Sequence, residues 1–142
     1  MISLRRLSVI VLVAVGSVSA AGCGGSSKPR FDLASTLNCL NANGHGVKAY
    51  PYTNKLKLLT GSGGGLRVVF PFGSEWIYMV FGKDPAEAQA IEKRAVTVAA
   101  QHEYLPPATV LAGVRVVGNV FYYADAGPVT TVEDSKIHSC LR

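Results

Sequence analysis

A short apolar run near the N-terminus decides which part of this chain folds and in which compartment. Arg5 and Arg6 precede a mostly apolar stretch of about 9 residues, residues 7–15, and small residues follow as far as position 22. A positive segment, a short apolar core and a small-residue stretch are the three parts of a secretory signal. A membrane span needs about 20 residues, so this run is too short to be one. We therefore expect the segment to be a signal peptide that is removed on export.

The end of this segment indicates which kind of signal it is. Ala20-Ala21-Gly22-Cys23 resembles the lipobox of bacterial lipoproteins, with Ala20 standing where leucine is usual. The resemblance implies cleavage before Cys23, a diacylglyceryl group on its thiol, and a lipid-anchored protein on the extracytoplasmic side of the cell membrane. Two acyl chains anchor a protein stably, whereas one binds only marginally. The alternative is an ordinary signal peptide cut close to the same residues.

The remaining chain divides into a tether and one domain. Residues 23–30 hold the candidate lipidated cysteine and a Gly/Ser-rich stretch without an apolar residue to bury, which predicts a flexible leash. Residues 31–142 then form a single domain, because removing residues 1–22 from 142 leaves 120, enough for one core. The formal charge of +5 falls to about +3, because Arg5 and Arg6 leave with the signal peptide.

Three cysteines leave one unpaired unless it has another role. Lipid on Cys23, as the resemblance implies, makes Cys39 and Cys140 the available pair, and export places them where disulfides persist. The bridge would close about 100 residues, for which the chain-entropy model gives roughly 4 to 5 kcal/mol. The alternative is two separate buried thiols. The three histidines are too scattered to complete a zinc shell with them, so we expect no metal and no other cofactor.

Capping residues predict three helices. Asp32 begins the first, Asp84 with Glu87 begins the second, and Thr130 with Glu133 forms a capping box for the third. The helices should end near residues 43, 104 and 141.

Extended segments are expected between these helices. They are residues 47–50, 66–70, 76–81, 110–117 and 120–124, with a hairpin turn at Gly118-Asn119 and a mobile glycine loop at residues 61–65. This order predicts an α+β two-layer sandwich: a mainly antiparallel sheet of about four to five strands with three helices on one face.

No motif in the chain assembles a catalytic site. It has no nucleophile elbow and no phosphate loop, and its helical glutamates are explained by capping and solvation. The basic residues concentrated between residues 28 and 67 could face anionic headgroups or a wall polymer, or form a solvated face and a protected sheet edge. We expect neither an enzyme nor a nucleic-acid-binding protein.

Aromatic residues on the predicted strands are the remaining functional candidates. Trp76, Tyr78, Tyr122 and Tyr123 lie on segments that hairpin pairing would bring into one sheet. If helices cover one face, these rings could form a ligand surface on the other; the alternative is that they are core. We expect a cell-envelope binding module that docks a protein, polymer or small ligand. A structural or accessory lipoprotein, and a small hydrolase with an unrecognised site, are the alternatives.

The lipid anchor is directly testable. Replacing Cys23 by Ala removes the thiol that would accept the lipid, so incorporation of labelled fatty acid should be abolished and the precursor should accumulate unprocessed. Metabolic labelling followed by electrophoresis measures both effects. Label retained by the variant would rule out Cys23 as the lipidation site.

Overall fold

The computed structural model describes residues 30–43, 46–53, 59–71, 76–103, 107–125 and 127–142. The expected signal peptide, Cys23 and nearly all of the tether lie outside these residues. Within them, no helix combines the length and apolarity needed to cross a membrane.

The centre of the fold is a five-stranded antiparallel sheet, with strand order β1-β2-β3-β5-β4. The strands are β1 (Lys48–Pro51), β2 (Gly64–Val69), β3 (Trp76–Phe81), β4 (Val114–Val117) and β5 (Val120–Ala124). The helices in the described part of the chain are α1 (Leu33–Ala42), α2 (Pro85–Glu103), α3 (Pro107–Gly113) and α4 (Thr131–Cys140). The α+β class and the antiparallel sheet are confirmed, with four helices where the sequence predicted three.

The additional helix, α3, replaces the beginning of an expected strand. Residues 110–117 were predicted to be extended, but the chain is helical as far as Gly113 and extended only from Val114. Pro107 occupies the first helical position, where its missing N–H costs nothing and its fixed φ suits a helix. The alternation of valines after Gly113 begins β4.

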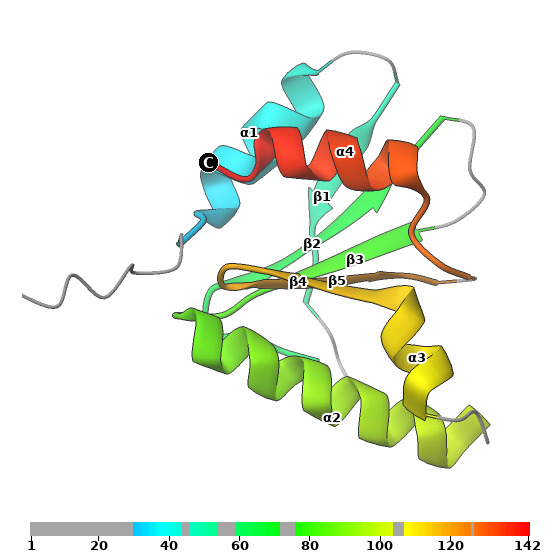
Figure 1. Ribbon diagram of the computed structural model, residues 1–142. Coiled ribbons are helices and arrows are strands. Elements are labelled where there is room, and N and C mark those ends of the chain that lie inside the picture. The colour runs from blue at the N-terminus through cyan, green and yellow to red at the C-terminus, as the bar shows by residue number, and fades with distance from the viewer. Residues whose placement is uncertain (1–29, 44–45, 54–58, 72–75, 104–106, 126) are drawn as a thin grey trace, which may run out of the picture.

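Helices lie on both faces of the sheet rather than on one (Figure 1). On one face α1 and α4 cover a core that includes Ile77, Met79 and Tyr122. On the other, Ile91 and Ala95 of α2 belong to a second cluster with Val80 and Phe121. The reason lies in the central strands: neighbouring positions of β3 and β5 are both apolar, so each face of these strands must be covered.

A disulfide between Cys39 and Cys140 joins α1 to α4, as expected. Their Cα atoms are 5.4 Å apart, within the usual range for a bridge. The bond links residues 101 positions apart and holds together the two helices that cover the first core.

Residues 61–65 do not form the expected mobile loop. The amide of Gly63 donates to the carbonyl oxygen of Phe81 at 2.8 Å, and a Cβ on Gly61 would collide with that same carbonyl. The carboxylate of Glu87 accepts hydrogen bonds from the amide and hydroxyl of Ser62 and from the amide of Lys83, which lower its pKa. Glycine is needed here because the chain runs against the end of β3 and the start of α2.

Asn119 does more than make the predicted hairpin turn. Its side chain is 2% exposed; Oδ1 accepts from the Phe31 amide at 2.6 Å, and Nδ2 donates to the Phe31 and Gly82 carbonyls at 3.1 and 2.7 Å. It therefore fixes the first residues of the folded domain to the junction of β3 and α2.

Replacing Asn119 by Ala should lower the free energy of unfolding by about 2 to 3 kcal/mol, because it leaves buried backbone groups of Phe31 and Gly82 without partners. Urea unfolding of the oxidised chain of residues 23–142, with Cys23 replaced by Ser, measures this loss. Lys93→Ala, at an exposed position of α2, is the control and should change stability by less than about 0.5 kcal/mol. A loss for Asn119→Ala no larger than that of the control would contradict this role.

Candidate functional site

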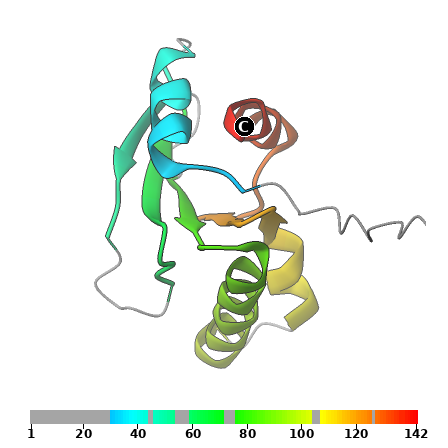
Figure 2. The ribbon, with the colours of Figure 1, turned by 90° about the vertical axis from the view of Figure 1, so that its left-hand side faces the viewer.

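The face of the sheet that carries α2 is only partly covered by the described helices. α2 packs against β4 and β5, whereas the part of the same face formed by β1, β2 and most of β3 carries no described helix (Figures 1 and 2). Aromatic residues gather on this open part and at its border with β5. We name it the open-face patch and define it by Tyr50, Tyr52, Arg67, Trp76, Tyr78 and Tyr123.

Strand register brings these side chains together. Tyr50 pairs with Arg67, Arg67 with Tyr78, and Tyr78 with Tyr123, so one row crosses four strands. Directly paired residues in neighbouring strands project from the same face. The ring centroids of Tyr52 and Tyr78 are 5.0 Å apart, and those of Tyr78 and Tyr123 are 5.4 Å apart. Tyr52, Tyr78 and Tyr123 therefore form a continuous ring cluster.

Arg67 and Trp76 extend this cluster toward the N-terminal end of β3. The guanidinium carbon of Arg67 lies 3.8 Å from the centroid of the Trp76 ring, a cation–π contact. Among the described residues, Arg67 makes no ion pair within 4.0 Å. Lys48 is exposed on the same face, two residues before Tyr50 in β1. The patch, with Lys48 beside it, thus combines aromatic rings with two positive charges that have no carboxylate partner among the described residues.

The side chains of Tyr78 and Tyr123 are partly exposed. No described residue hydrogen-bonds to them, and in the described part of the chain no buried polar side-chain atom lacks a partner. Burial of the rings raises the pKa of Tyr78 and raises that of Tyr123 to about 12, and the charge of Asp125 adds to both shifts. Both phenols therefore stay protonated at neutral pH, and each keeps an O–H group that can donate a hydrogen bond.

Tyr122 was expected to share this surface and does not. It points to the opposite face, is 0% exposed, and donates its hydroxyl to Oδ1 of Asp134 in α4 at 2.6 Å. Consecutive residues of a strand project from opposite faces, so Tyr122 and Tyr123 cannot both line one surface. The structure therefore brings Trp76, Tyr78 and Tyr123 to one face and places Tyr122 in the core on the other, and the ligand surface itself stays a prediction.

Sequence reasoning also missed Tyr50, Tyr52 and Arg67. The sequence did contain a signal for Tyr50. Lys48 and Tyr50 alternate with the buried Val47 and Ala49, which predicts that the side chains of Lys48 and Tyr50 share a face. The pairing of Arg67 with Tyr78 depends on the register between β2 and β3, which alternation does not determine.

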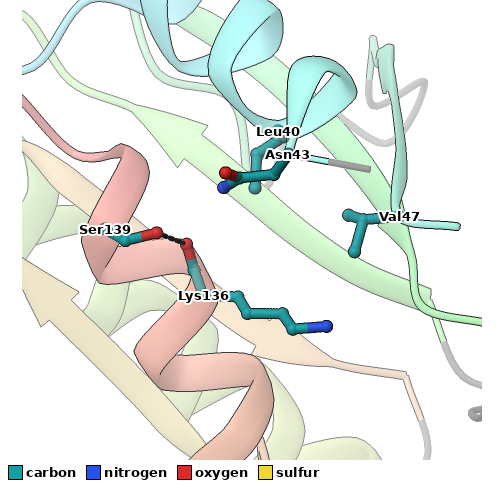
Figure 3. Close-up of a pocket in the computed structure, with 5 residues that line it drawn as sticks. All are labelled: Leu40, Asn43, Val47, Lys136 and Ser139. Carbon is teal, nitrogen blue, oxygen red and sulfur yellow. Dashed lines mark hydrogen bonds between the residues drawn. The ribbon is translucent and has the colours of Figure 1, made fainter. Parts of the chain in front are cut away.

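A small pocket lies on the other side of the molecule, between α1, α4 and the beginning of β1 (Figure 3). It is lined by Leu40, Asn43, Val47, Lys136 and Ser139 and has a volume of about 160 Å³. Ligand pockets usually enclose about 300 to 1,000 Å³, so it is too small for most ligands. Asn43 also donates from Nδ2 to Sγ of Cys140 at 3.0 Å, which gives this residue a structural role beside the disulfide.

Other polar clusters do not form a reactive centre. Asp134 accepts from Tyr122, and its Oδ1 lies 3.8 Å from Nε2 of His138 and 4.0 Å from Nε of Arg115. The contacts with Tyr122 and Arg115 join α4 to β5 and β4, and Tyr122 is too deeply buried to meet a substrate. Within the described residues, no group of three or more His, Cys, Asp and Glu side chains is placed to hold a metal ion.

Comparison with known proteins finds no matching protein-family model, no matching curated protein and no matching solved structure.

The contact between Arg67 and Trp76 can be tested by fluorescence, because Trp76 is the only tryptophan in the chain. Arg67→Ala uncovers the indole, so acrylamide quenching should increase, and loss of the contact should lower the unfolding free energy by about 0.5 to 1 kcal/mol. Lys136→Ala, whose ammonium group lies over Phe70 instead, is the control for quenching. Unchanged quenching in Arg67→Ala would show that the two side chains are apart in solution.

Proposed function

We propose that this chain is a lipid-anchored binding module of the cell envelope, held at the membrane through Cys23, whose extracytoplasmic domain binds an envelope component with the open-face patch. The anchor is supported by the resemblance of residues 20–23 to a lipobox and by the tether that follows. An extended chain of the 8 residues 23–30 reaches at most about 28 Å, so the domain would stay close to the membrane surface.

The single observation that carries the binding role is the half-exposed cluster of Tyr, Trp and Arg side chains on the open face. Tyrosine, tryptophan and arginine are enriched at recognition surfaces, because rigid rings supply contact area at low entropic cost. A monomeric domain gains little from leaving such residues half-exposed, since covering them would stabilise the fold. Confinement by the lipid would raise the effective concentration of the module for components near the membrane.

The proposal assigns no catalytic step to the domain. The groups gathered at the patch are phenols, a guanidinium and an indole, and the ammonium group of Lys48 lies beside them; this set is suited to holding a ligand by ring contacts and hydrogen bonds. None of the patch residues is a nucleophile oriented by a neighbouring base, which covalent hydrolysis would require.

The test uses the mature chain with Cys23 replaced by Ser, so that lipid does not contribute to binding. It is incubated separately with isolated membranes and with insoluble wall material, and the bound fraction is measured after sedimentation. We expect the wild type to bind one of these fractions and Tyr78→Ala with Trp76→Ala to reduce its affinity at least about tenfold, as loss of central aromatic anchors does.

Val132→Ala is the matched control, because Val132 is 65% exposed on α4, on the opposite face of the sheet. It should bind like the wild type. Equal binding by the patch variant and the wild type would contradict the proposed surface, and binding of neither fraction would contradict the proposed function. Release of soluble fragments from wall material by the wild type would instead indicate a hydrolase.

A further inference from the structure

The charges around the open-face patch favour an anionic ligand. Arg67 and Lys48 contribute positive charges without a carboxylate partner among the described residues. Stacking on Trp76 holds the Arg67 guanidinium in place, which lowers the entropic cost of using its N–H groups for a second partner. Asp125 follows β5, and its amide donates to the carbonyl oxygen of Trp76. One negative charge therefore lies beside the rings on the β5 side, whereas Arg67 and Lys48 lie on the β1 and β2 side. An anionic group is therefore best placed beside Arg67 and Lys48, away from Asp125.

The rings favour a ligand that also has apolar surface and many hydroxyl groups. Aromatic faces carry partial negative charge and attract the C–H groups on the flat sides of sugar rings. The Tyr78 and Tyr123 hydroxyls stay protonated and have no hydrogen-bond partner among the described residues, so they can donate to and accept from the hydroxyl groups of a sugar. The row of side chains that crosses four strands, three tyrosines and Arg67, offers several successive contacts, as a chain of repeated units requires.

The exposure of the patch favours a narrow ligand over a flat membrane surface. Tyr50 is 43% exposed, whereas Arg67, Trp76, Tyr78 and Tyr123 are only partly exposed. A bilayer contacts groups that protrude, and half-buried rings would give it little area. A thin polymer can follow the sheet surface and reach them.

Resting on the proposed binding function, we propose that the open-face patch binds an acidic polysaccharide. Its sugar rings lie against the tyrosine and tryptophan rings, and its anionic groups pair with Arg67 and Lys48. The anionic groups can be carboxylates or oxyanions such as sulfate and phosphate, because Arg pairs with both in the same bidentate geometry.

The experiment titrates the mature chain carrying Cys23→Ser with two acidic polymers, polygalacturonate and dextran sulfate. Methyl-esterified polygalacturonate and dextran are their neutral counterparts, and polyglutamate supplies charge without sugar rings. Calorimetry measures Kd, and Trp76 emission reports whether the ligand reaches the patch. We expect at least one acidic polysaccharide to bind at least about tenfold more tightly than its neutral counterpart and than polyglutamate, with a change in Trp76 emission.

Two variants locate the site by the direction in which they change Kd, and a third is a control. Arg67→Gln should weaken binding at least about tenfold, since it removes a charged hydrogen-bond donor. Asp125→Asn should tighten binding, because it removes a negative charge near the rings. Lys136→Gln is the control: it removes one positive charge, as Arg67→Gln does, but on α4. It should alter Kd less than about twofold.

The outcomes separate this inference from the proposed function. If patch variants lose envelope binding but neither acidic polymer exceeds its neutral counterpart, the ligand class is wrong and the binding surface remains. Equal binding of polyglutamate would show that charge alone acts and would overturn the polysaccharide assignment. Binding to phosphatidylglycerol vesicles with a shift of Trp76 emission, in the absence of polysaccharide binding, would identify a membrane-docking surface instead.

Discussion

Burial of both faces of β3 and β5 is the constraint on which the rest of this fold depends. Val80 and Phe81 are neighbours in β3, as are Phe121 and Tyr122 in β5, and all four side chains are buried. A sheet with such strands at its centre needs a cover on each side. The disulfide-linked pair α1 and α4 supplies one cover and α2 supplies the other.

The open-face patch exists because α2 covers only part of its face of the sheet. α2 lies over β4, β5 and the end of β3, so the same face of β1 and β2 has no described helix above it. Side chains that would otherwise be core, such as Tyr78, therefore contact each other and Arg67 at the edge of solvent. The binding surface that we propose is thus a product of the packing that stabilises the domain.

The first residues of the described domain are attached to the sheet by specific hydrogen bonds. Asn119 holds both backbone groups of Phe31, the first residue after the expected tether, against the β4–β5 turn. If Cys23 carries lipid, force on the anchor enters the domain at this point, at the ends of β3 and β5 near Phe81 and Val120. Trp76 lies at the other end of β3, so the binding surface extends away from the attachment.

Local features of the sequence determined the elements, and tertiary packing decided what they present to solvent. Caps at Asp32, Asp84 and Thr130 and the bounds of β3 and β5 were predictable, because side-chain-to-backbone bonds and strand alternation act over a few residues. The pairing of Cys39 with Cys140 followed from the lipobox resemblance and was confirmed. Alternation alone separates Tyr122 from Tyr123, but only packing decides which of them meets α4. The placement of α2 over part of one face, the register of Arg67 beside Tyr78 and the three bonds of Asn119 join residues far apart in the chain, so no local pattern encodes them.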